Sequence, residues 1–157
     1  MSRIQLALNV DDLERAVRFY STMFGVGPAK VRPGYANFAV ADPPLKLVLI
    51  ENADAAPGSL NHLGVEVDSS AQVRDAATRL AAGGLATDVE EKSSCCYALQ
   101  DKVWVEGPAG EPWEFYTVLG DSDAPAAGRG TGAADEHACC APSSGAGSGA
   151  EVARARG

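Results

Sequence analysis

The chain lacks a hydrophobic segment long enough to cross a membrane. Apolar runs near the predicted strands are short, as in Leu47-Val48-Leu49-Ile50, and fall far below the roughly 20 residues of a transmembrane helix. No apolar segment of the secretory type follows Met1-Ser2-Arg3. We therefore expect a cytoplasmic protein that does not span a bilayer.

Positive charge is also scarce. The chain has 13 Lys and Arg against 21 Asp and Glu, which gives a formal net charge of -8 at pH 7. The basic residues are interspersed with acidic ones and form no stripe that would attract a phosphate backbone or anionic lipid headgroups. We therefore expect neither a nucleic acid nor a membrane as a partner.

Cysteine is sparse, and its spacing is not that of a thiol-disulfide enzyme. The four cysteines form two adjacent pairs, Cys95-Cys96 and Cys139-Cys140, and no Cys-x-x-Cys motif is present. Neighbouring cysteines lie too close for an unstrained disulfide bond. We expect free thiols in a reducing cytosol, with disulfides between the two pairs as the alternative.

The length and composition predict one folded domain and a tail. With 157 residues, 46% of them hydrophobic, the chain can bury a core as one domain or as two small fused modules. After Gly120 the composition changes to Ala, Gly, Ser and Pro, with almost no large apolar residue. We predict a domain over residues 1–120 and a disordered tail over residues 121–157 that contains His137-Ala138-Cys139-Cys140.

An internal repeat organises the predicted domain. Residues 4–11, IQLALNVD, align with residues 61–68, NHLGVEVD, and their apolar positions coincide. Each copy predicts a short strand that ends at an Asp suited to cap a following helix. In the first copy, Asp11 and Glu14 have the spacing of a capping box.

Each repeat continues with a helix and three strands. The first helix follows Asp11 and stops at Gly25, and the second spans about residues 70–82 and stops at Gly83-Gly84. The pattern predicts an α+β fold of two βαβββ modules, about residues 1–53 and 60–120. The predicted strands after the helices are residues 29–31, 35–41, 45–51, 86–92, 103–106 and 113–118.

Three polar residues are expected to converge within this fold. Side chains alternate along a strand, so the superposed repeats bring Gln5 and His62 to equivalent faces, with Glu114 on a last strand. An isolated histidine on an apolar strand is more often a core residue, and it is the repeat that favours a metal site here. We predict that these three residues bind a divalent metal.

The types of ligand atom limit the range of candidate metals but do not identify one. An amide oxygen, an imidazole and a carboxylate resemble the two-histidine-one-carboxylate triad of non-haem iron oxygenases, with glutamine in place of one histidine. The set suits iron(II) and also manganese, nickel or cobalt. If Pro44 is matched to Pro112, Lys46 stands where the second module has Glu114, and a fourth ligand is missing.

From about Ile4 to Val118 the residues resemble the vicinal oxygen chelate superfamily, also called glyoxalase or bleomycin-resistance-like. The resemblance implies that the two modules form a curved mixed sheet around a metal site. Three segments are similar to organoarsenical carbon-arsenic lyases and their cadmium-induced relatives. These segments are Ser93-Ser94-Cys95-Cys96-Tyr97, Lys102-Val103-Trp104-Val105 and Pro112-Trp113-Glu114-Phe115-Tyr116.

This resemblance implies an iron(II)-dependent, dioxygen-consuming enzyme that cleaves the carbon-arsenic bond of trivalent methyl or aryl arsenicals and releases arsenite. Gln5, His62 and Glu114 would hold the iron, and Cys95 and Cys96 would bind the arsenic. A monosubstituted trivalent arsenical has two exchangeable oxygen positions, which two neighbouring thiolates can fill.

Further residues have weaker claims to a role. Lys102 is a candidate catalytic residue because a cation near the bound oxygen species stabilises negative charge, although a solvated strand-edge lysine is an equal alternative. Cys139 and Cys140 are candidate accessory thiols that pass the arsenical to the first cysteine pair or receive the arsenite. A tail without function is the simpler interpretation.

Two other functions stay open. The first is a protein that sequesters cadmium or another soft ion through Cys95 and Cys96 and cleaves no bond. The second is a glyoxalase-like isomerase or an extradiol dioxygenase, neither of which needs a thiol pair. The sequence also leaves open the preferred organoarsenical, the fate of its organic group, and whether the protein is a monomer or a homodimer.

Overall fold

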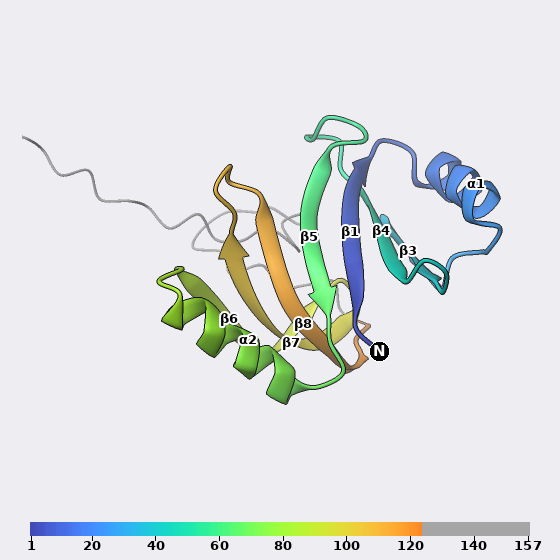
Figure 1. Cartoon of the computed structure of the whole chain (residues 1–157). Coiled ribbons are helices and arrows are strands. Elements are labelled where there is room, and N and C mark those ends of the chain that lie inside the picture. Colours follow the sequence, from blue (N-terminus) through green and yellow to red (C-terminus); the bar gives the residue numbers. More distant parts are fainter. Residues whose placement is uncertain (124–157) are drawn as a thin grey trace, which may run out of the picture.

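The computed structural model describes residues 1–123 and shows one curved, mixed sheet with a helix against each half (Figure 1). The predicted tail residues His137, Cys139 and Cys140 lie outside the described residues. The elements are β1 Arg3–Val10, α1 Leu13–Phe24, β2 Lys30–Arg32, β3 Tyr35–Val40, β4 Leu45–Glu51, β5 Leu60–Glu66, α2 Ser70–Ala82, β6 Thr87–Cys95, β7 Ala98–Glu106 and β8 Pro112–Asp121.

The sheet has eight strands in the order β2-β3-β4-β1-β5-β8-β7-β6. Strands β1 and β5 pair antiparallel at its centre, and each pairs in parallel with the last strand of its own module, β4 or β8. The two halves therefore have the same strand order, read outward from the centre. This confirms the predicted fold of two βαβββ modules in one curved mixed sheet.

The second helix, α2, spans Ser70–Ala82 as predicted, but both helices are capped one residue after the Asp that the repeat indicates. Asp12, rather than Asp11, is the N-cap of α1, and its side chain accepts a hydrogen bond from Arg15 N at 2.8 Å. Ser69, rather than Asp68, caps α2. In both repeats a second short polar side chain follows the expected one, so the sequence offers two candidates for the same role.

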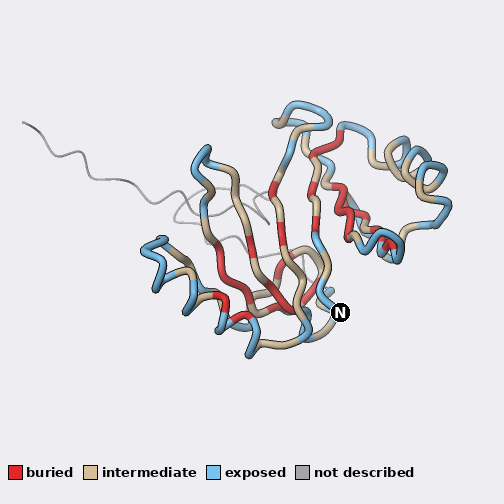
Figure 2. Tube along the Cα trace, viewed as in Figure 1, coloured by how far each residue is buried: buried red, intermediate tan, exposed pale blue. Residues whose placement is uncertain are grey.

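Buried residues concentrate along the strands, and the helices are mostly intermediate or exposed (Figure 2). Helix α1 packs on an apolar cluster that includes Phe38 and Leu47, and α2 packs on one that includes Val103. We call the opposite face of the sheet the inner face. Buried polar side chains gather there, although burial of polar groups costs stability. They are Gln5, Lys46, His62, Gln100, Lys102 and Glu114.

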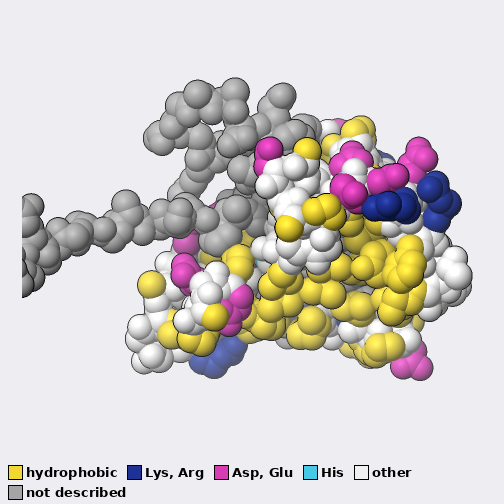
Figure 3. Space-filling view, turned by 90° about the horizontal axis from the view of Figure 1, so that it is seen from above, with side chains coloured by type: hydrophobic (Ala, Val, Ile, Leu, Met, Phe, Trp, Pro, Cys, Tyr) yellow, Lys and Arg dark blue, Asp and Glu magenta, His cyan; other side chains and the backbone are white. Residues whose placement is uncertain are grey.

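Hydrophobic side chains also gather on the surface seen from above, beside charged ones (Figure 3). Exposed large apolar residues of the fold include Phe19 and Met23 on α1. Within residues 1–123, no helix is both long and apolar enough to cross a membrane.

Candidate active site

The structure brings Gln5, His62 and Glu114 together on the inner face, from β1, β5 and β8. Gln5 Nε2 lies 2.9 Å from His62 Nε2 and 2.8 Å from Glu114 Oε1, and His62 Nε2 lies 3.4 Å from Glu114 Oε1. Ligand atoms at right angles on a metal with bonds of about 2.1 Å lie ~3 Å apart. The spacing of these side-chain atoms therefore matches one face of a metal coordination sphere.

Gly64 permits this approach. It pairs with Gln5 across β1 and β5 and with Glu114 across β5 and β8, so the two side chains meet over a position without a side chain. A Cβ atom at Gly64 would lie 3.2 Å from Gln5 Nε2 and 3.2 Å from Glu114 Cγ. Any larger residue would force the two side chains apart.

The hydrogen bonds of the three side chains are those expected around a cation. His62 Nδ1 lies 2.7 Å from Asn61 Oδ1, an acceptor that fixes the proton on Nδ1 and leaves the Nε2 lone pair for the centre of the site. Gln5 Nε2 donates to this lone pair and to Glu114 Oε1. The two N–H groups of the Gln5 amide thus point at His62 and Glu114, where a bound cation would otherwise attract the same lone pairs.

One further observation supports a metal at these residues. Glu114 Oε2 is buried and has no hydrogen-bond partner within the described part of the chain. Among residues 1–123, no three His, Cys, Asp or Glu side chains form a metal-binding group, so a three-ligand set at this place must include the Gln5 amide oxygen. A half-turn of the Gln5 amide, whose two ends have similar shapes, supplies that oxygen beside His62 Nε2 and Glu114.

Lys102 lies beside the same carboxylate. Its Nζ is 3.4 Å from Glu114 Oε2, and the two residues are only 2% and 3% exposed. Burial alone would lower the pKa of Lys102, but the charge of Glu114 raises it above its usual value. Burial likewise opposes ionisation of Glu114, whereas Lys102, His62 and Gln5 together lower its pKa to about 2. Lys102 is therefore a buried, charged partner and not a solvated strand-edge lysine.

The cysteine pair lies at a tight hairpin turn. The predicted strands over residues 86–92 and 103–106 leave a longer loop between them, and that prediction is wrong. Strand β6 continues through Cys95, which pairs with Ala98 at the start of β7. Cys96 and Tyr97 alone form the turn, with φ of 52° and 62°, as in a type I′ turn. This conformation costs L-residues roughly 1–2 kcal/mol each, so the turn fixes the backbone that carries the sulfur atoms.

The two sulfur atoms are close to each other. Cys95 Sγ lies 3.4 Å from Cys96 Sγ, and both residues line the pocket that contains Gln5, His62 and Glu114. At this distance the two sulfur atoms are not bonded to each other, so in reduced protein they form a pair of neighbouring thiols.

Contacts with the first module hold the turn in place. Lys30 Nζ donates to Tyr97 O at 3.2 Å, and the Tyr97 hydroxyl donates to Pro33 O at 3.2 Å. The rings of Tyr97 and Tyr35 lie 5.9 Å apart. From the second module, Ser122 N donates to Tyr97 O at 3.1 Å. The turn thus spans the opening of the curved sheet and offsets its backbone strain with contacts on both sides.

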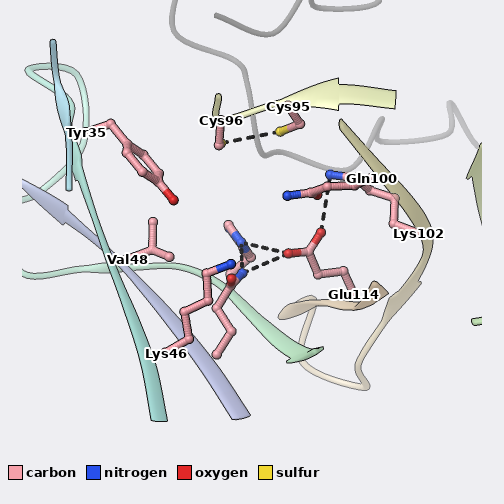
Figure 4. A pocket seen from close by; sticks show the side chains of 10 residues that line it. Tyr35, Lys46, Val48, Cys95, Cys96, Gln100, Lys102 and Glu114 are labelled. Carbon is pink, nitrogen blue, oxygen red and sulfur yellow. Dashed lines mark hydrogen bonds and ion pairs between the residues drawn. The ribbon is translucent and has the colours of Figure 1, made fainter. Parts of the chain in front are cut away.

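The pocket encloses about 250 Å³, its open mouth included. Figure 4 shows the cysteine pair at one end, with Tyr35 and Val48 on one wall and Gln100, Lys102 and Glu114 on the other. The hydroxyl of Tyr35 points into the space between the walls. The first module contributes Tyr35 and Val48 together with the charged Lys46, and the facing wall, from the second module, is polar. We call Tyr35 and Val48 the apolar wall.

The strand register corrects the expected counterpart of Glu114. Leu6 pairs with Leu47, as its repeat equivalent Leu63 pairs with Trp113. The next residue in each pair of strands is then Val48 or Glu114, so Val48 is the true equivalent. The match of Lys46 with Glu114 is wrong by two residues, because Pro44 lies in a turn whereas Pro112 is already the first residue of β8.

The sequence did not single out Tyr35, Val48 or Gln100 as pocket residues. Val48 shares a strand face with Lys46, and alternation along β4 could have found it. Gln100 likewise lies two residues before Lys102 on β7, so alternation could have found it too. For Tyr35 the sequence offers no comparable signal.

Comparison with known proteins identifies relatives of the whole chain. Residues 3–115 match the family model of the Glyoxalase/Bleomycin resistance protein/Dioxygenase superfamily. The chain is 60% identical over 152 residues to a trivalent organoarsenical cleaving enzyme of Thermomonospora curvata, which covers 97% of each protein. It is 63% identical over 123 residues to the cadmium-induced protein CadI of Mycobacterium tuberculosis, or 78% of this chain and 80% of that protein.

Solved structures share the fold at low sequence identity. A superfamily member from Vibrio splendidus 12B01 superposes with a TM-score of 0.51 at 16% identity, over 76% of this chain and 100% of that one. Homoprotocatechuate 2,3-dioxygenase from Arthrobacter globiformis gives a TM-score of 0.55 at 21% identity, over 76% of this chain and 36% of that one. This chain belongs to the glyoxalase/bleomycin resistance protein/dioxygenase superfamily.

Proposed function

We propose that this protein cleaves the carbon-arsenic bond of trivalent organoarsenicals and releases arsenite. One observation carries the proposal: Cys95 and Cys96 line the same buried pocket as Gln5, His62 and Glu114. A thiol pair suits arsenic, and a metal-ligand set within the same pocket suits a reaction on what the thiols hold. The similarity over 97% of the chain to a trivalent organoarsenical cleaving enzyme supports this assignment.

The metal in this proposal is iron(II), held by Gln5 Oε1, His62 Nε2 and a carboxylate oxygen of Glu114. Three protein ligands leave coordination positions for other molecules. The bound iron supplies the redox chemistry, with dioxygen as co-substrate. The protein supplies the geometry, and holding reactants in the correct orientation contributes several orders of magnitude in rate.

The cysteines bind the substrate. In the reduced protein, the two thiols replace both hydroxyl groups of RAs(OH)2, so that two As–S bonds form and two water molecules leave. The 3.4 Å separation of Cys95 Sγ and Cys96 Sγ allows one atom to bridge them. Because thiolate is the reactive form and the pair must stay reduced, the proposal places the protein in a reducing compartment such as the cytoplasm.

The two walls of the pocket then have different tasks. The organic group packs against the apolar wall, where Tyr35 and Val48 are 7% and 3% exposed. On the polar wall, the ammonium group of Lys102 stabilises negative charge that develops near Glu114. Packing of the organic group against one wall directs the carbon-arsenic bond toward the three ligand residues.

The test is release of arsenite from a trivalent methyl or phenyl arsenical by reduced protein, measured by chromatography with elemental mass spectrometry. Wild-type protein should release arsenite only when both iron(II) and oxygen are present. Cys95→Ser/Cys96→Ser should release none and should lose tight binding of the arsenical. Release that is unaffected by the cysteine substitutions would contradict the proposal.

A protein that sequesters a soft ion is the second candidate, favoured by the 63% identity to a cadmium-induced protein. It predicts stoichiometric retention of cadmium or of the arsenical by the thiols, with the carbon-arsenic bond intact under every condition. The same assay separates the two functions, since only the enzyme produces more arsenite than there is protein.

A further inference from the structure

Tyr116 contacts the oxygen end of the Gln5 amide. It lies two residues after Glu114 on β8, on the same face, and is fully buried at 0% exposed. Its hydroxyl lies 2.6 Å from Gln5 Oε1 and 3.1 Å from Glu66 Oε2. One hydroxyl group therefore connects the Gln5 amide to a second carboxylate, which is not part of the ligand set.

Basic side chains hold that second carboxylate in place. Arg3 Nε donates to Glu66 Oε2 at 2.8 Å, and Arg3 Nη2 donates to Oε1 at 3.3 Å. Lys46 Nζ lies 3.7 Å from Glu66 Oε2 and 4.9 Å from the centre of the Tyr116 ring. Glu66 is thus a fixed acceptor beside the hydroxyl, with neighbours that leave it little freedom to turn away.

A tyrosine hydroxyl can donate one hydrogen bond and accept another, whereas a carboxylate held by two basic side chains accepts. The Tyr116 hydroxyl, 3.1 Å from Glu66 Oε2, can therefore donate to Glu66 and accept from a second group at the same time.

We propose that Tyr116 is a positioning residue that makes the metal-binding orientation of the Gln5 amide possible. The proposal rests on the ligand role of Gln5 given above. An amide binds a metal only through its oxygen, so Oε1 must face His62 and Glu114, and Nε2 must then face Tyr116. In that orientation the Tyr116 hydroxyl accepts from Nε2 and donates to Glu66 Oε2.

The same hydroxyl serves the orientation seen here, in which it donates to Gln5 Oε1. Glu66 allows the amide to turn, because it accepts the hydrogen bond of the Tyr116 hydroxyl when Gln5 Oε1 no longer does. Phenylalanine at position 116 would leave the buried N–H groups of the turned amide without an acceptor. Loss of such partners behind metal ligands typically lowers metal affinity 10- to 100-fold.

The experiment is an anaerobic titration with cobalt(II), followed by visible absorption, of reduced wild-type and Tyr116→Phe protein. Tyr116→Phe should bind cobalt(II) 10- to 100-fold more weakly. Tyr35→Phe is the matched control for metal affinity, because Tyr35 is also a buried tyrosine but its hydroxyl accepts from Asn37 Nδ2 at 2.9 Å. Its cobalt(II) affinity should stay at the wild-type level.

A second background separates positioning from a general structural effect. Histidine has no amide to orient, so Tyr116→Phe should cost little cobalt(II) affinity when Gln5→His is already present. An equal loss in both backgrounds, or no loss in the wild-type background, would overturn the proposal. Should Tyr116→Phe fail to fold, Glu66→Ala, which removes the second acceptor, should still weaken cobalt(II) binding several-fold, and unchanged binding would overturn it.

The outcome is independent of the reaction. If cobalt(II) affinity behaves as described but no arsenite is ever released, Tyr116 positions Gln5 and the proposed function fails. If His62→Ala binds cobalt(II) as tightly as wild-type protein, the metal does not bind at this set of ligands, and the role of Tyr116 fails with it.

Discussion

The two modules share one fold but divide the chemistry unequally. Of the candidate ligands, the first module supplies Gln5 and the second supplies His62 and Glu114. Where the second module has Glu114, the first has Val48 in the equivalent register, and only the second carries the cysteine pair. The repeat therefore fixes where side chains meet, and the residue type at a few equivalent positions decides whether they bind a metal or an apolar group.

Two buried lysines show the same division. Lys102 in the second module lies 3.4 Å from Glu114, which raises its pKa against the effect of burial. Lys46 in the first module lies 3.7 Å from Glu66, yet burial outweighs that contact and lowers its pKa. Glu66 already has Arg3 as a closer partner. Lys102 is thus coupled to the candidate metal ligands, and Lys46 supports the region behind them.

The largest expected effect is the loss of the second module's imidazole. His62→Ala should lower both metal affinity and arsenite release by more than about 100-fold, since even the groups behind metal ligands contribute 10- to 100-fold. The other histidine of the chain, His137, is the matched control, and His137→Ala should leave both quantities unchanged. Isothermal titration with iron(II) under nitrogen, followed by the arsenite assay, measures them. Equal behaviour of the two variants would place the metal elsewhere.

The next effect compares the two lysines. Lys102→Met leaves Glu114 buried beside an apolar side chain, and breaking a buried ion pair costs about 3–5 kcal/mol of unfolding free energy. Lys46→Met should cost clearly less, because Glu66 keeps Arg3 as its partner. Urea denaturation of the reduced, metal-free proteins measures the difference. Added metal should restore stability in Lys102→Met, and similar losses in both variants would contradict the assignment of Glu114 as the coupled group.

A smaller effect on metal affinity is expected at the repeat position where the second module has glycine and the first has alanine. Gly64→Ala places a Cβ 3.2 Å from Gln5 Nε2, so metal affinity should fall roughly 10-fold, as for other changes beside metal ligands. Ala7 is its repeat equivalent, and Ala7→Gly should cost about 1 kcal/mol of stability without weakening metal binding. Cobalt(II) titration of both variants distinguishes them. Wild-type affinity in Gly64→Ala would show that the ligands do not need to meet over this position.

The smallest effect concerns the apolar wall. Val48→Ala widens the pocket, so release of arsenite from a methyl arsenical should fall relative to a phenyl arsenical by about 10-fold, the scale of a missing methylene contact. Competition between the two substrates in one reaction measures the ratio. Val40→Ala, a similar truncation in the outer cluster under α1, is the control and should leave the ratio unchanged. A constant ratio in Val48→Ala would mean that the organic group lies elsewhere.

Local pattern and the repeat were sufficient to predict the fold and the meeting of three side chains. Alternation along a strand assigns Gln5 and His62 to a face, and the superposition of the repeats brings the two faces together. The curved mixed sheet also follows from the resemblance. Strand alternation depends on neighbouring residues in the sequence, and the repeat depends on a second copy of the same segment, so both can be read from the sequence.

Features that depend on the register between distant strands could not be predicted from the sequence. The counterpart of Glu114 was placed at Lys46 instead of Val48, since nothing local sets how β4 slides along β1. The hairpin at Cys96 and Tyr97 contains neither of the usual turn residues, Asn and Gly, and therefore gave no turn signal. The sequence does not indicate a role for Tyr116, because its contact with Gln5 exists only once the strands are in place.

The most direct test of the account is arsenic X-ray absorption of reduced, iron(II)-loaded protein with one equivalent of a trivalent methyl arsenical, before and after oxygen is admitted. The account predicts two As–S bonds and one As–C bond without oxygen, and loss of the As–C bond once oxygen is present. An As–C bond that persists in oxygen, or arsenic that never binds the two sulfur atoms, would contradict the claim that the thiols hold the substrate for cleavage at the adjoining metal site.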